Sequence, residues 1–193
     1  MHDIEPFFRW RDEYTAEDDE RSPFYGRTYD EFGFSNSIYN YYIHPQWDDF
    51  GSATLYIKIL FTNYQKRYVI IELMSEWNDV LYNDIMFLKR NICDHLIKEG
   101  INKFILISDN VLNFHGGDDS YYQEWYDDVK EDEGWIININ MLDHVRQEML
   151  HYNLEYYINM PGEINDMEWR LMKPDMFFEA IDKFISEKIK RLK

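Results

Sequence analysis

Cysteine is nearly absent from this sequence, since Cys93 is the only one among 193 residues. A single thiol can form neither an intramolecular disulfide nor a cysteine-based zinc site. Nothing in the cysteine content indicates an oxidising compartment. We therefore expect a cytoplasmic protein.

Long apolar runs are also missing. No stretch approaches the roughly 18 to 20 apolar residues that a membrane-spanning helix needs. The first residues, MHDIEPFFRWRDEY, have neither a basic leader nor an uninterrupted apolar segment. We expect a soluble chain with no cleaved signal and no membrane contact.

Motifs for phosphate binding and nucleophilic catalysis are absent as well. The sequence has no P-loop, no GxGxxG and no GxSxG, and its only adjacent glycines, at 116 and 117, lie beside two carboxylates. A nuclease strand would carry Glu-x-Lys, but Glu72 is followed by Leu73 and Met74. We expect no cofactor, and we favour a protein that is not an enzyme.

Basic residues are few, with 20 Lys and Arg against 37 Asp and Glu, which gives a formal net charge of -17. Residues 1–50 hold 12 acids and 4 bases, and residues 109–133 hold 9 acids and 1 base. Such a surface repels nucleic acids and anionic lipids and favours a basic protein partner. The alternative is that the acidity only keeps the protein soluble.

The charge does not indicate disorder, because 45% of the residues are hydrophobic and 18% are aromatic. Residues 1–36 mix charges and aromatics without periodicity, and we expect an irregular acidic and aromatic N-terminal arm packed on the domain. Residues 37–193 are expected to form a single α/β domain.

The first half of that domain reads as strands, over residues 38–43, 53–62 and 68–74. The five residues between Thr62 and Tyr68 are too few for a parallel crossover, so the last two strands should form an antiparallel hairpin.

Helices and strands then alternate. Six apolar residues follow helical spacing: Trp77, Leu81, Ile85, Leu88, Ile92 and Leu96. After them come a strand at 103–108, a helix at 120–129, a strand at 135–140, a helix at 143–152, a strand at 155–160 and a helix from Pro174. This order predicts a mixed central sheet with later parallel strands, in two or three layers.

The order of elements resembles that of STAS-type regulatory domains, which also begin with strands and continue in alternation. The resemblance implies a regulatory α/β domain. It transfers no activity, because no motif in this sequence carries that family's function.

One group of residues suggests metal-assisted hydrolysis at the carboxyl edge of the sheet, where open α/β sheets bind ligands. Its members are Glu76, Asp109, His115, Asp118 and Asp119. The aspartate that phosphatase motifs need two residues after Asp109 is replaced by Val111, and glycines and a helix start explain residues 115–120 equally well. We expect no bound metal.

A second group suggests a protein interface. In the acidic segment 120–135, one helical face carries Tyr122, Trp125, Tyr126 and Val129. This face suggests a protein interface, and the alternative is that it packs on the sheet. The candidate binding residues are Tyr121, Glu124, Asp127, Asp128, Glu131 and Asp132.

Two functions follow from these groups. The first is a non-catalytic binding or regulatory protein that meets a basic protein partner, as an inhibitor or immunity-type antidote does. The second is the metal-assisted hydrolase. The sequence does not predict the oligomeric state.

Overall fold

The computed structural model describes residues 4–30 and 32–192. Its centre is a four-stranded sheet in the order β3–β4–β5–β6. The strands are β3 (Leu55–Asn63), β4 (Tyr68–Asn78), β5 (Lys103–His115) and β6 (Trp135–Ile139). The pair β3 and β4 is antiparallel, and β4, β5 and β6 run parallel. This arrangement confirms the predicted mixed α/β fold and its hairpin.

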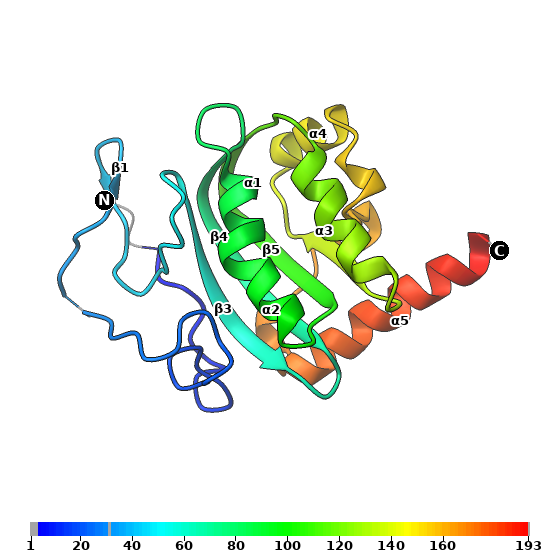
Figure 1. Cartoon of the computed structure of the whole chain (residues 1–193), viewed down its shortest axis with the longest axis horizontal. Helices are drawn as coiled ribbons and strands as arrows, with labels where there is room; N and C mark the ends of the chain where they lie inside the picture. The colour runs from blue at the N-terminus through cyan, green and yellow to red at the C-terminus, as the bar shows by residue number, and fades with distance from the viewer. Residues whose placement is uncertain (1–3, 31, 193) are drawn as a thin grey trace.

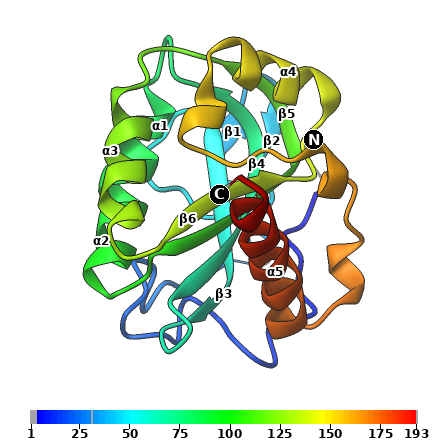
Figure 2. The same ribbon diagram turned by 90° about the vertical axis from the view of Figure 1, so that its right-hand side faces the viewer.

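Helices cover both faces of the sheet and make three layers (Figure 2). The helical elements are α1 (Asp84–Phe87), the π-helical segment η1 (Leu88–Cys93), α2 (Asp94–Lys98), α3 (Ser120–Lys130), α4 (Asp143–His151) and α5 (Pro174–Leu192). Elements α1 to α3 lie on one face and α5 lies on the other (Figure 2). Three single-turn 3-10 segments, η2 (Leu154–Tyr156), η3 (Gly162–Ile164) and η4 (Trp169–Leu171), connect α4 to α5.

The helices on each side of the sheet bury one face of their side chains against it. Ile85, Leu88 and Ile92 are buried against the sheet from the α1 side, as their spacing predicts. In α3, Trp125 and Val129 are fully buried, so the aromatic face of this helix packs inward. On the opposite face, Ile181 of α5 lies in a separate apolar cluster.

The predicted helical stripe is wrong at its amino-terminal end. Trp77 belongs to β4 and is fully buried there, whereas Leu81 lies in the loop after β4 and is 72% exposed. Asn83 has a left-handed φ of 53°, which interrupts helical geometry, and the helix begins at Asp84. The helical spacing of apolar residues continues across this loop, but the helical conformation of the backbone does not.

Three other strand predictions need correction. Residues 38–43 form two short strands, β1 (Ser37–Ile38) and β2 (Tyr41–Tyr42), because Tyr39 turns the chain with a φ of 51°. In 155–160 only Asn159 bridges to the sheet, at Ile137. β5 continues beyond residue 108 to His115, pairing with β4 through two register shifts.

Residues 4–30 lie alongside β3, the edge strand, and are drawn in blue beside the sheet (Figure 1). Trp10 packs against Trp169 and Phe177 on the α5 face. Ala16 and Phe24 are buried in the core on the opposite face. This segment therefore contacts both faces of the sheet.

Within the described part of the chain, no helix is long and apolar enough to cross a membrane.

Candidate functional site

The loop between β4 and α1 exposes apolar side chains at its tip. Val80 is 61% exposed, Leu81 is 72% exposed and Tyr82 is 42% exposed. None of the three belongs to an apolar cluster of the described residues or packs against one. These side chains therefore contribute little to the stability of the fold.

The amino-terminal end of this loop is fixed by Asp79. Its Oδ1 accepts hydrogen bonds from the indole of Trp77 at 3.1 Å and from the backbone N–H of Ile85 at 2.9 Å. Its Oδ2 accepts a bond of 2.6 Å from the hydroxyl of Tyr122 on α3. Burial raises the pKa of Asp79 to about 7, although these donors favour the charged form.

The carboxyl-terminal end is fixed by Asp84 in the same way. Its two oxygens accept bonds of 2.6 Å from the hydroxyls of Ser52 and Thr54, and the backbone N–H of Asn78 donates at 2.8 Å. Burial raises the pKa of Asp84, opposed by these bonds. Two buried carboxyl groups therefore hold the loop at both ends.

A neighbouring loop supports the first one. The backbone N–H of Asp79 donates to the carbonyl of His115 at 2.9 Å. A Cβ atom at Gly117 would lie 3.1 Å from the carbonyl oxygen of Asp79, and one at Gly116 would lie 2.4 Å from the ring of Tyr152. The glycine pair thus permits a close approach of backbone and ring rather than phosphate binding.

The hairpin of β1 and β2 adds more exposed aromatic surface. The Tyr39 hydroxyl donates to Oε2 of Glu76 at 2.8 Å, and this bond raises the pKa of Tyr39. Six of the sixteen large, exposed apolar side chains in the described residues lie in these two segments: Tyr39, Tyr41, Tyr42, Val80, Leu81 and Tyr82. We call these six the carboxyl-edge surface.

Three of the segments that contribute to this end of the sheet contain no Lys or Arg. Residues 28–57, 68–88 and 104–129 together carry fourteen acids and no basic side chain other than histidine. Several of these acids pair with bases from elsewhere in the chain, but no ion pair involves Glu76 or Asp118 among the residues that the structure describes. The carboxyl-edge surface therefore has acidic neighbours that are not neutralised.

The five hydrolase candidates do not form one cluster. Among the described residues, the group of three or more metal-type ligands that come close together is Asp94, Glu124 and Asp128, and it includes none of Glu76, Asp109, His115, Asp118 and Asp119. Asp118 accepts from the backbone N–H of Ser120, the first residue of α3, and Asp119 accepts from the hydroxyl of Tyr157. Asp109 pairs with Arg170 instead.

Asp109 does belong to a polar cluster, with residues that the sequence analysis missed. Glu72 is nearly fully buried and accepts bonds from Arg170 at 3.1 Å, from Asn110 at 3.2 Å and from the backbone of Phe7 at 2.8 Å. Burial raises the pKa of Glu72 to about 7. The group joins three segments of the chain, and only Glu72 is fully shielded from solvent, since the side chain of Arg170 is 43% exposed. The one feature of the sequence that indicated this cluster is an acidic residue, Glu72, within an otherwise apolar strand.

The acids predicted for protein binding on α3 are mostly neutralised within the chain. Glu124 pairs with Arg90 at 2.5 Å, Asp127 with Lys130 at 2.5 Å and Asp132 with Arg67 at 2.6 Å. Glu131 is exposed and Tyr121 is half-buried, with the guanidinium of Arg90 over its ring. This helix therefore offers less free charge than its sequence suggests.

A cation already occupies the one group of three metal-type ligands found in the described residues. That group is Asp94, Glu124 and Asp128. The ammonium of Lys89, whose side chain is fully buried, lies 2.9 Å from Asp128 and 3.3 Å from Glu124, and it also bonds Asp94. Lys89 supplies the positive charge that a metal ion would bring.

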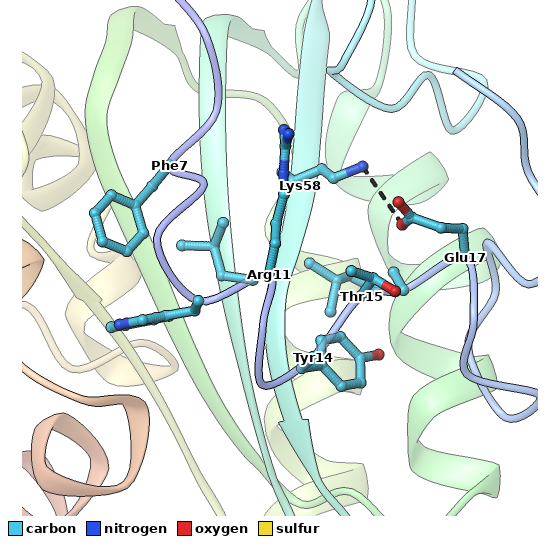
Figure 3. Close-up of a pocket in the computed structure, with 10 residues that line it drawn as sticks. Phe7, Arg11, Tyr14, Thr15, Glu17 and Lys58 are labelled. Atoms are coloured by element: carbon cyan, nitrogen blue, oxygen red, sulfur yellow. Dashed lines mark ion pairs between the residues drawn. The ribbon is translucent and has the colours of Figure 1, made fainter.

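A hollow between the N-terminal segment and β3 contains a second buried lysine (Figure 3). Lys58 and Glu17 point toward each other there, 4.0 Å apart. On the other side Lys58 is 3.2 Å from Asp48 and lies over the ring of Tyr29. Burial lowers the pKa of Lys58, opposed by Asp48. These contacts attach the N-terminal segment to the edge strand.

Comparison with known proteins gives no family. No protein-family model matches the sequence, and no curated protein matches it. Three solved structures align with parts of the fold. The unphosphorylated anti-sigma factor antagonist SpoIIAA is 14% identical over 67% of this chain and 96% of its own, with a TM-score of 0.42.

The other two structures are similarly distant. The phosphorylated form of the Bacillus cell fate determinant SpoIIAA is 14% identical over 66% of this chain and 98% of its own, with a TM-score of 0.40. The protein TM1081 is 16% identical over 72% of this chain and 98% of its own, with a TM-score of 0.41. At these TM-scores the fold class rests on the strand order, and the STAS-like arrangement stays a resemblance.

Proposed function

We propose that this chain is a non-catalytic binding or regulatory protein that captures a basic protein partner with the acidic end of its sheet. The observation that carries the proposal is that Glu76 and Asp118, at this end of the sheet, have no ion pair among the described residues and lie beside the exposed carboxyl-edge surface. A field of one sign attracts a partner of opposite charge and repels nucleic acids and anionic membranes.

Two further observations support a protein as the partner. The carboxyl-edge surface combines four tyrosines with Val80 and Leu81, and aromatic side chains are enriched where proteins bind one another. The single thiol, Cys93, is buried, which suits a reducing compartment, so the proposal places the encounter in the cytoplasm. An inhibitor or an immunity-type antidote fits this description.

The hydrolase hypothesis lacks support of this kind. None of its five candidate groups belongs to the cluster of metal-type ligands found in the described residues, and Asp109 is paired with Arg170. A catalytic site needs its groups to converge on one position.

The test begins with affinity capture by the full chain from extract of its native cells, at low and at physiological salt. A candidate partner is then purified and its association rate is measured against wild type, the double variant Glu76→Gln and Asp118→Asn, and the control Glu20→Gln, which changes an exposed acid elsewhere. We expect the double variant and added salt each to slow association by about threefold or more, since screening shortens to about 8 Å at physiological ionic strength.

A partner with a basic surface and salt-dependent capture supports the proposal. It is overturned if the captured partner is acidic or if nucleic acid is captured instead. It is also overturned if neither added salt nor the double variant changes the association rate.

A further inference from the structure

We propose that the loop 79–84 is the anchor of this interface, with Leu81 and Tyr82 entering an apolar pocket of the basic partner. The inference rests on the proposed function and names the residues that perform it. Three observations support it: the hydrogen bonds that hold the two ends of the loop, the absence of core contacts at its tip, and the charges around it.

The loop is held more firmly than a connection between a strand and a helix requires. Each of its ends is a buried carboxyl group that accepts three hydrogen bonds, at Asp79 and at Asp84. The side chain of Asn78 also accepts from the backbone N–H of Leu81 at 3.0 Å. Burying a carboxyl group opposes its ionisation, and this chain does so at both ends of one short loop.

The tip itself takes no part in the core. Val80, Leu81 and Tyr82 are exposed and lie outside every apolar cluster of the described residues. A rigid loop that points apolar side chains into solvent loses little conformational freedom when it binds. Its geometry therefore suits insertion into a preformed pocket.

The charges around the loop favour a basic protein as the partner. Glu76 and Asp118 are acids without an ion pair in the described residues, and the segments 68–88 and 104–129 that contain them have no Lys or Arg. A second copy of this chain would bring the same acidic face, and anionic lipid would bring phosphates, so both are repelled. A protein pocket lined by apolar groups and bordered by Lys or Arg complements the surface.

The experiment compares Leu81→Asp with Leu171→Asp in the full chain. Leu171 is 76% exposed but lies on η4, outside the carboxyl-edge surface, so it is a matched control. With the purified basic partner, we expect Leu81→Asp to weaken binding at least about tenfold through faster dissociation, and Leu171→Asp to change it less than about twofold.

A second variant tests how the loop is held. Thr54→Val removes one donor to Asp84 and leaves the tip unchanged. If this variant keeps the circular dichroism spectrum of the wild type, we expect faster dissociation with an unchanged association rate, since encounter depends on charge.

The outcomes are distinguishable. Salt-dependent binding of a basic partner that Leu81→Asp leaves unchanged overturns the anchor and preserves the proposed function. Absence of any basic partner overturns both. Concentration-dependent dimerisation, or sedimentation with phosphatidylcholine vesicles, that Leu81→Asp abolishes would assign the loop to a second copy or to a lipid surface and overturn this inference.

Discussion

The hydroxyl of Tyr122 on α3 lies 2.6 Å from Oδ2 of Asp79, at the start of the loop that exposes Leu81. Tyr122 is 1% exposed, so water cannot replace it as a donor. This single bond connects a crossover helix to the conformation of the loop.

Tyr122→Phe should therefore destabilise the protein. The variant keeps the buried ring but leaves a buried carboxyl group with one donor fewer, which costs about 1 to 3 kcal/mol. Urea denaturation followed by tryptophan fluorescence measures the change. Tyr121→Phe alters the half-buried neighbour and is expected to stay within about 0.5 kcal/mol. Equal effects of the two variants would contradict the role of the bond.

Glu72 should make the stability depend on pH. Burial raises its pKa from the ordinary value of 4.5 to about 7. The folded chain thus holds this proton more tightly than the unfolded chain does. The resulting contribution to stability is complete below about pH 4.5 and is lost as the pH rises toward 7.

Glu72→Gln removes that titration. We expect the difference in unfolding free energy between wild type and variant to change by up to about 1.4 kcal/mol per pH unit between pH 4.5 and 7, and to be flat above. Denaturation curves across this range test it. Glu20→Gln, at an exposed carboxylate, serves as the control. A constant difference across the range would show that Glu72 does not titrate there.

The periodicity of apolar residues predicted most of the sheet and the crossover helices, because the side chains that face the core must be apolar at regular intervals. It failed at residues 77–83, where Trp77 and Leu81 keep helical spacing although one lies in a strand and the other in a loop. The spacing of apolar residues does not predict that Asn83 adopts a left-handed conformation or that Asp79 and Asp84 are buried. Those facts depend on donors from Ser52, Thr54 and Tyr122, which are distant in sequence.

The candidate site was predictable only in part for the same reason. An acidic carboxyl edge follows from composition and from the positions of the strand ends. The pairing of Glu72 with Arg170 spans 98 residues, and no local pattern relates the two. Likewise, the charge of α3 was visible in the sequence, whereas its neutralisation by Arg90 was not.

A comparison of Ile85 with Leu81 checks the corrected boundary of the helix. Ile85→Ala should destabilise by about 2 to 5 kcal/mol, because this side chain is fully buried and its loss leaves a cavity. Leu81→Ala should change the unfolding free energy by less than about 0.5 kcal/mol, since the side chain is 72% exposed. Chemical denaturation measures both. A large loss of stability for Leu81→Ala would place this side chain in the core after all.

The acids around Lys89 give the last prediction. Its ammonium group is fully buried and lies 3.3 Å from Glu124 and 2.9 Å from Asp128. Replacing these acids by Gln and Asn leaves a buried positive charge with fewer partners, and we expect a loss of about 2 to 4 kcal/mol in unfolding free energy. The matched control changes Glu131 and Glu133 to Gln, which are exposed and have no ion pair in the described residues, and should have little effect.

A further substitution separates loss of charge balance from loss of packing. Adding Lys89→Met to the Glu124→Gln and Asp128→Asn variant removes the unpaired charge and keeps an apolar side chain of similar length. We expect this triple variant to regain most of the lost stability, because replacing a buried ion pair by apolar groups is often neutral. If the triple variant is as unstable as the double one, Glu124 and Asp128 stabilise η1 and α3 through contacts other than their attraction to Lys89.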